Sequence, residues 1–62
     1  MCELKIISDN AVVFENAIYA KAINNNVLVK DIMGKSKEFK NHRIIEVNIA
    51  RETLIIFSSE MT

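Results

Sequence analysis

The sequence predicts one all-β domain over residues 1–62, folded as a small barrel or a strongly curved antiparallel sheet of about five to seven short strands. The length leaves room for one hydrophobic core and no second. Short runs rich in Ile and Val follow one another, separated by polar residues typical of tight turns. The chain has no proline and a single glycine, so Asp and Asn must provide most of the turns.

The first two strands are expected on either side of the polar pair at residues 9–10. Cys2, Leu4 and Ile6 fall on alternate positions, which predicts a strand with these side chains on one face. A second short run, residues 11–14, follows the turn and predicts a second strand.

Residues 14–22 fit two interpretations. Apolar residues four positions apart, together with Ala, Glu and Lys, favour a helix. The alternative is a hairpin that pairs residues 17–23 with residues 27–33 across the turn of three Asn at 24–26. We favour the hairpin, because so short a helix is marginal alone and the run after the turn needs a neighbouring strand.

The second half of the chain predicts a further strand and a closing hairpin. Gly34 marks a turn that leads into the polar strand 36–40. Residues 45–50 alternate apolar and polar side chains, and residues 54–57 form a β-branched and aromatic run. The polar pair at residues 51–52 separates the two runs, which we therefore expect to form a hairpin.

The composition gives expectations about location and assembly. Eight basic residues balance eight acidic ones, so no global field attracts nucleic acid or an anionic membrane. The apolar runs are far shorter than the roughly 20 residues that span a bilayer. With no secretory signal and one unpaired thiol, we expect a cytoplasmic protein. Half of the residues are apolar, more than so small a domain easily hides, and a homodimer is the usual way to bury the remainder.

Few residues suggest chemistry, and we expect no enzyme. The sequence contains no glycine-rich phosphate loop, no CxxC and no HExxH motif, and no nucleophile–base pair can be identified. His42 is the only histidine, so one chain cannot build a His-based metal site. It falls in a charged segment, where we expect a solvated loop histidine.

Basic residues gather between residues 35 and 43, around one aromatic side chain. Such a segment on a small barrel can follow a phosphate backbone while the aromatic ring stacks on a base. The other interpretation is an edge strand that lysines protect against aggregation, with the aromatic ring turned into the core. The zero net charge favours the second interpretation. The residues concerned are Lys35, Lys37, Phe39, Lys40 and Arg43.

Cys2 stands directly behind the initiator Met1. If Met1 is removed, the α-amine and thiolate of Cys2 form a five-membered chelate that suits Ni(II) or Cu(II) better than Zn(II). One chain offers two such donors, and two chains at a twofold axis offer four. The alternative is a small apolar side chain that packs beside Leu4 and Ile6, and the residues alone favour this packing role.

The chain as a whole resembles the CooT family of small nickel-binding proteins, which are associated with maturation of carbon monoxide dehydrogenase. The resemblance follows the pattern of apolar positions through most of the chain. It is carried by Met1-Cys2, residues 3–8, Val13-Phe14-Glu15-Asn16 with residues 17–23, the turn 24–26, residues 27–33, residues 35–38 with Phe39, and residues 44–50 and 53–57 around Arg51-Glu52.

This resemblance implies an SH3-like barrel that forms a homodimer with one Ni(II) ion per dimer. It implies a metallochaperone or nickel sensor, with Cys2 of each chain as ligand and a nickel enzyme as client. If Met1 is retained, the Cys2 backbone nitrogen or the Met1 amine takes the place of the Cys2 amine. Donor chemistry alone does not separate nickel from copper or cobalt. Related sequences are also labelled predicted RNA-binding proteins, which keeps RNA as the alternative partner of the basic segment.

Overall fold

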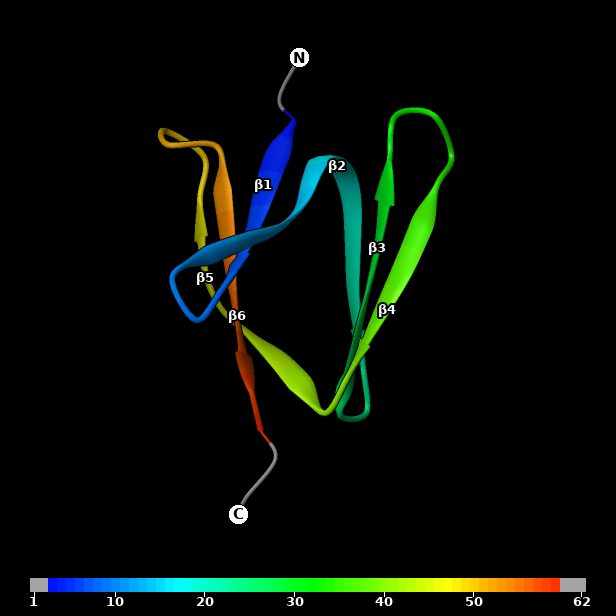
Figure 1. Cartoon of the computed structure of the whole chain (residues 1–62), viewed down its shortest axis with the longest axis vertical. Coiled ribbons are helices and arrows are strands. Elements are labelled where there is room, and N and C mark those ends of the chain that lie inside the picture. The colour runs from blue at the N-terminus through cyan, green and yellow to red at the C-terminus, as the bar shows by residue number, and fades with distance from the viewer. Residues whose placement is uncertain (1–2, 60–62) are drawn as a thin grey trace.

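The computed structural model describes residues 3–59, which form a single six-stranded sheet (Figure 1). No helix in this part of the chain is long and apolar enough to cross a membrane. The strands are β1 (Leu4–Ser8), β2 (Ala11–Ile23), β3 (Asn26–Asp31), β4 (Ser36–Lys40), β5 (His42–Asn48) and β6 (Thr53–Ser58).

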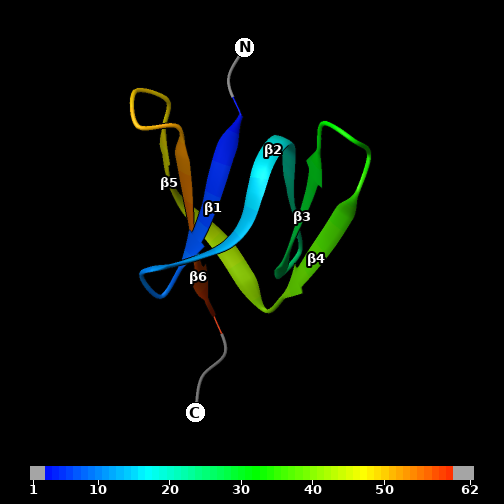
Figure 2. The same cartoon turned by 45° about the horizontal axis from the view of Figure 1, so that its top comes forward.

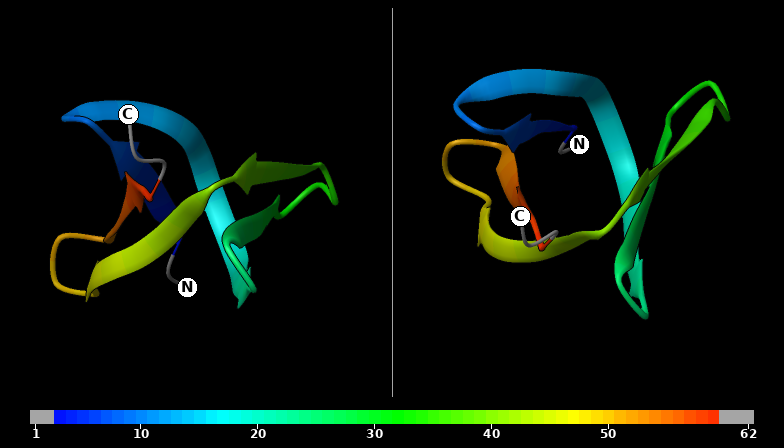
Figure 3. Two further views of the ribbon diagram at one scale, coloured as in Figure 1. Left: turned by 90° about the horizontal axis from the view of Figure 1, so that it is seen from below. Right: turned by 60° about the horizontal axis from the view of Figure 1, so that its bottom comes forward.

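The strands lie side by side in the order β4-β3-β2-β1-β6-β5. The predicted all-β class and the strongly curved sheet are confirmed, and the sheet does not close into a barrel (Figures 2 and 3). The pairing of β1 with β6 is parallel, whereas the other four pairings are antiparallel. This pairing is the exception to the antiparallel expectation, and it joins strands that are separated in the sequence by β2, β3, β4 and β5.

The long strand β2 joins two segments that the sequence suggested were separate strands. Its first half pairs with β1 and its second half with β3, and the strand bends sharply between them (Figure 1). Between the pairs Leu4–Ala17 and Ile6–Phe14, β2 contains one residue more than β1. Asn16 lies in this bulge with a φ of 62°, a conformation that Asn tolerates better than most residues. The bend lets one strand serve both halves of the sheet.

The hairpin interpretation of residues 14–22 is confirmed. Ile23 pairs with Asn26 across a two-residue turn, and the pairing continues as far as Ala17 and Asp31. Asn24 has a φ of 55°, as a tight hairpin turn requires. The run that follows the turn thus finds its neighbouring strand, and this pairing outweighs the local helix propensity.

Asx residues provide most of the turns, as expected. Asp9 and Asn10 both have positive φ, and so does Asn41 at the corner where β4 passes into β5. The Asn41 corner is fixed by hydrogen bonds to neighbouring elements, because His42 N donates to Asn25 O at 2.8 Å and Ser59 N donates to Asn41 O at 2.7 Å. Positive φ was not expected at Asn16 or at Glu52.

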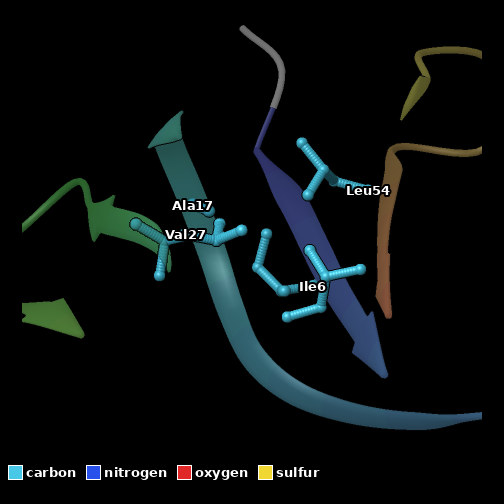
Figure 4. Packing of buried hydrophobic residues seen from close by; sticks show 6 residues of the cluster. Ile6, Ala17, Val27 and Leu54 are labelled. Carbon is cyan, nitrogen blue, oxygen red and sulfur yellow. The ribbon is translucent and has the colours of Figure 1, made fainter. Parts of the chain in front are cut away.

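The hydrophobic core lies inside the curve of the sheet (Figure 4). Each half contributes, so that side chains from β1 and β6 meet those from β2 and β3. Burying one Val, Leu or Ile side chain stabilises a fold by about 1.5–3 kcal/mol. The buried residues are Ile6, Ala17, Val27, Val29, Leu54 and Ile56.

Strand β5 shows how a bulge changes the face that a residue occupies. The alternation of Ile45, Val47 and Ile49 predicted a strand over residues 45–50, whereas β5 begins earlier, at His42, and ends at Asn48. All three side chains are more than half exposed. An extra residue in β5 between the pairs Ile44–Ile56 and Glu46–Ile55 shifts the register. Ile44 therefore packs against the core instead of Ile45.

The assigned core predicts that alanine substitutions at two isoleucines lower the free energy of unfolding by different amounts. Ile6→Ala removes a fully buried side chain and should lower the free energy of unfolding by about 2–5 kcal/mol. Ile23→Ala, at a residue that is 42% exposed, should lower it by less than about 1 kcal/mol. Urea unfolding of both variants at one protein concentration measures this difference, and equal losses would contradict the assigned core.

The bend of β2 predicts opposite effects of two substitutions at Asn16. Asn16→Gly should leave the stability unchanged or raise it, because glycine adopts positive φ without strain. Asn16→Val should lower it by about 1–2 kcal/mol, because a β-branched side chain is strained there. Thermal unfolding followed by circular dichroism tests the order, and a Val variant as stable as the Gly variant would argue against the bend.

Candidate functional site

The two residues that the sequence selects as metal ligands, Met1 and Cys2, lie outside the described residues. The structure does describe where they are attached. Leu4, at the start of β1, pairs with Ala17 of β2, and Lys5 N donates a hydrogen bond of 2.9 Å to Glu52 O in the turn between β5 and β6. Strand β1 is therefore held by neighbouring elements on both sides from its first two residues onward.

Exposed apolar side chains surround this end of the sheet. The chain enters β1 between the β5–β6 turn and the bend of β2, and the β3–β4 turn lies at the same end on the far side of β2 (Figures 1 and 2). Met33 at the β3–β4 turn is 86% exposed, and Ile49 at the β5–β6 turn is 58% exposed. Ile18 and Ile32 are each about half exposed. We call these four residues (Ile18, Ile32, Met33 and Ile49) the N-terminal rim.

Two hydrogen-bonded turns hold the rim in place. The Asp31 carboxylate Oδ1 accepts hydrogen bonds from Met33 N at 3.0 Å and from Lys35 N at 2.8 Å. In the other turn, Asn48 Oδ1 accepts a hydrogen bond of 3.0 Å from Arg51 N. Sequence reasoning missed the rim because it placed Ile32, Met33 and Ile49 in strands, at residues 27–33 and 45–50, whereas β3 ends at Asp31 and β5 at Asn48.

His42 is not a solvated loop residue, contrary to expectation. It is the first residue of β5, half-buried, with its ring 5.8 Å from the Phe39 ring in an edge-on arrangement. Its Nδ1 lies 2.8 Å from Lys40 O, and because a carbonyl only accepts, Nδ1 must donate. In the neutral ring, Nε2 then carries the free lone pair. Strand β5 begins at the end of the sheet opposite the start of β1 (Figure 1), so His42 lies far from the attachment point of Cys2 in the same chain.

The basic segment does not form one continuous stripe. Lys37 and Phe39 pair with the buried residues Val29 and Val27, so both side chains lie on the core-facing side of β4. Phe39 packs against the core, as the edge-strand interpretation expected, and Lys37 Nζ lies 5.2 Å from the centre of its ring. Lys40, the residue after Phe39, lies on the opposite face of β4.

Arg43 and Lys35 complete the basic segment at its two ends. Arg43 is exposed beyond the Asn41 corner, and Lys35 is exposed in the β3–β4 turn. The five residues of the segment are therefore spread over the β3–β4 turn, both faces of β4 and the start of β5.

An open cavity of about 500 Å³ lies between the bend of β2 and the β3–β4 turn. Its walls carry two lysines and two carboxylates, of which Asp31 already accepts the turn hydrogen bonds. Among residues 3–59, no group of three His, Cys, Asp or Glu side chains lies close enough together to hold a metal ion. The lining residues are Val13, Phe14, Glu15, Asn16, Asp31, Lys35, Ser36 and Lys37.

A family model described as CO dehydrogenase accessory protein CooT matches residues 1–57 of the chain. The chain belongs to the CooT family. The match begins at Met1, so it includes Cys2, and it extends through nearly all of β6. Membership implies an accessory role toward CO dehydrogenase. A search of curated proteins found no match to the chain.

The hydrogen bond from His42 predicts its tautomer. Neutral His42 should carry its proton on Nδ1, because Lys40 O accepts from that atom. Two-dimensional ¹H–¹⁵N spectra of the ring nitrogens distinguish the two tautomers. A proton found on Nε2 at a pH where the ring is neutral would contradict the described position of the ring.

Proposed function

We propose that this CooT-family chain is a cytoplasmic homodimer that binds Ni(II) as cargo for CO dehydrogenase, as a metallochaperone or as a nickel sensor. Cys2 of each chain supplies the thiolate, and one ion is shared by two chains. The observation that carries the proposal is the family match, which begins at Met1 and includes the only cysteine of the chain. A family that serves CO dehydrogenase is consistent with nickel as the cargo.

The chemistry of the donors supports a shared site. A thiolate with an adjacent amine or backbone nitrogen gives an N,S pair, and two such pairs complete the four-coordinate planar set that Ni(II) accepts. The nitrogen is the Cys2 amine if Met1 is removed, and the Cys2 backbone nitrogen or the Met1 amine if it is retained. Because the donors must lose protons before they bind, the affinity should rise with pH.

The place where β1 begins also suits a carrier of cargo. Strand β1, which follows Cys2 in the sequence, begins at an end of the sheet, next to exposed turns (Figure 1). A partner protein can approach an ion at such an end without opening the fold. A client enzyme can therefore take the ion by ligand exchange, which is what delivery requires.

RNA binding through Lys35, Lys37, Phe39, Lys40 and Arg43 gains no comparable support. Phe39 is the only aromatic side chain offered for stacking, and it packs against the core. Lys37 and Lys40 lie on opposite faces of β4, so they do not follow one phosphate backbone together. We propose no catalytic role for the chain.

Substitution of Cys2 tests the proposal directly. Cys2→Ser should abolish Ni(II) binding because it removes the thiolate, while the strand pairing of β1 and the dimer persist. Wild-type protein with a known N-terminus should bind about one nickel per two chains, with thiolate-to-metal absorption. Isothermal titration and absorption spectroscopy measure both quantities.

His42→Gln is the matched control, because it removes the only imidazole of the chain, a ligand that also suits Ni(II). Its nickel affinity should equal that of the wild type, since His42 begins β5 at the end of the sheet opposite the start of β1. Tight nickel binding by Cys2→Ser, or its loss in His42→Gln, would overturn the proposed site.

A further inference from the structure

We propose that the outer face of β2, β3 and β4 docks on an acidic surface of the client enzyme. This inference rests on the part of the proposed function in which CO dehydrogenase is the client. It goes further because it names the surface of the chain that makes the contact and the chemistry of the partner surface. We call the residues concerned the basic face: Tyr19, Lys21, Leu28, Lys30, Glu38 and Lys40.

The strand register places these side chains on one side of the sheet. Val27 and Val29 of β3 are fully buried in the core, so Leu28 and Lys30, which alternate with them, lie on the side turned away from the core. Residues that pair with these two on the neighbouring strands share that side. They are Lys21 and Tyr19 on β2 and Glu38 on β4, and Lys40 follows two residues further along β4.

Positive charge is concentrated on this face, although the chain as a whole is neutral. The face carries three lysines and one carboxylate, Glu38. All three lysines are exposed, and none of them forms an ion pair within residues 3–59. Protection of a sheet edge explains Lys40 on β4, but not Lys21 or Lys30, because β2 and β3 are interior strands. These charges are therefore available to acidic groups of a partner.

The face also has the anatomy of a protein contact, in which charged side chains surround an apolar centre. Leu28 lies on the middle strand, between Lys21 on one neighbouring strand and Glu38 on the other. Tyr19 is 42% exposed and adds a ring of the kind that is enriched in protein interfaces. The matching partner surface carries carboxylates around an apolar side chain.

A nucleic acid fits this face less well than a protein does. Stacking of a base needs an open aromatic ring, whereas Lys30 Nζ lies over the Tyr19 ring, 5.1 Å from its centre, and covers one side of it. Glu38 is the neighbour of Lys40 along β4 on this face, and its carboxylate repels a phosphate group that approaches Lys40. The face therefore favours an acidic protein surface over a phosphate backbone.

The size of the face suits a contact that dissociates. Three strands spaced by about 4.8 Å give a width of roughly 10 Å between the outer two, which is narrow for a permanent interface. Attraction between opposite charges speeds association at such a contact and weakens as salt is added. A protein that delivers cargo needs a contact of this kind, because it must leave the client after the transfer.

Charge reversal on the face tests the proposal against a matched control. Lys21→Glu with Lys30→Glu reverses two charges on the basic face. The control, Arg43→Glu with Arg51→Glu, reverses two exposed charges in β5 and in the β5–β6 turn. Binding to purified CO dehydrogenase of the same organism is measured by biolayer interferometry at low and at high ionic strength.

The wild type and the control should bind the enzyme alike, and more weakly at high ionic strength. The face variant should bind at least about tenfold more weakly at low ionic strength. Circular dichroism checks that the variants fold, and Lys21→Glu alone takes the place of the double variant if that variant does not fold. A face variant that binds as tightly as the wild type would overturn the inference, as would a wild type that does not bind the enzyme with or without nickel.

Two further measurements separate this inference from other accounts. If the face variant loses affinity for a single-stranded oligonucleotide but not for the enzyme, the face belongs to nucleic acid and the inference is overturned. Nickel titration of the same proteins tests the proposed function independently. A wild type that binds the enzyme through the basic face but binds no nickel supports the inference and contradicts the nickel site. A wild type that binds one nickel per two chains but not the enzyme does the reverse.

Discussion

The rest of this structure depends on one constraint, which is that a single sheet must supply every wall of its own core. Six strands give one apolar face, so that face is buried only if the sheet folds back on itself. Two features of the chain fold the sheet back. The bulge at Asn16 bends β2, so that its first half pairs with β1 and its second half with β3. The corner at Asn41 leads the chain from β4, at one edge of the sheet, into β5, at the other edge. Ile6 and Leu54 from one half then meet Ala17 and Val27 from the other.

The same constraint explains why the ends of the sheet remain open. Residues 3–59 form one curved sheet, and no helix or second layer among them covers an end of it. Turns project there, and the apolar side chains of the N-terminal rim stay exposed beside the start of β1.

Much of the fold could be predicted from local sequence signals, because most turns are built from Asp and Asn. The turn at residues 9–10 closes a hairpin as expected, the turn expected at 24–26 is shortened to two residues because Asn26 already belongs to β3, and the run after Gly34 becomes β4. The bulges could not be predicted in this way. At Ile45 and Asn16, the register of pairing with the neighbouring strand decides which residue is extra, and the apolar pattern of the strand does not show that choice. His42 was misplaced for a related reason, since its ring is held by Phe39 and Lys40 O only once the corner at Asn41 has formed.

The central claim is that two chains share one nickel ion through Cys2, and subunit mixing tests it most directly. Wild-type and Cys2→Ser chains are mixed in varying proportions, allowed to exchange, and titrated with Ni(II) while thiolate-to-metal absorption is recorded. A site shared by two cysteines predicts that the saturating absorption falls with the square of the wild-type fraction. Absorption that falls in direct proportion to the wild-type fraction would show that each chain binds its own ion, and would contradict the account.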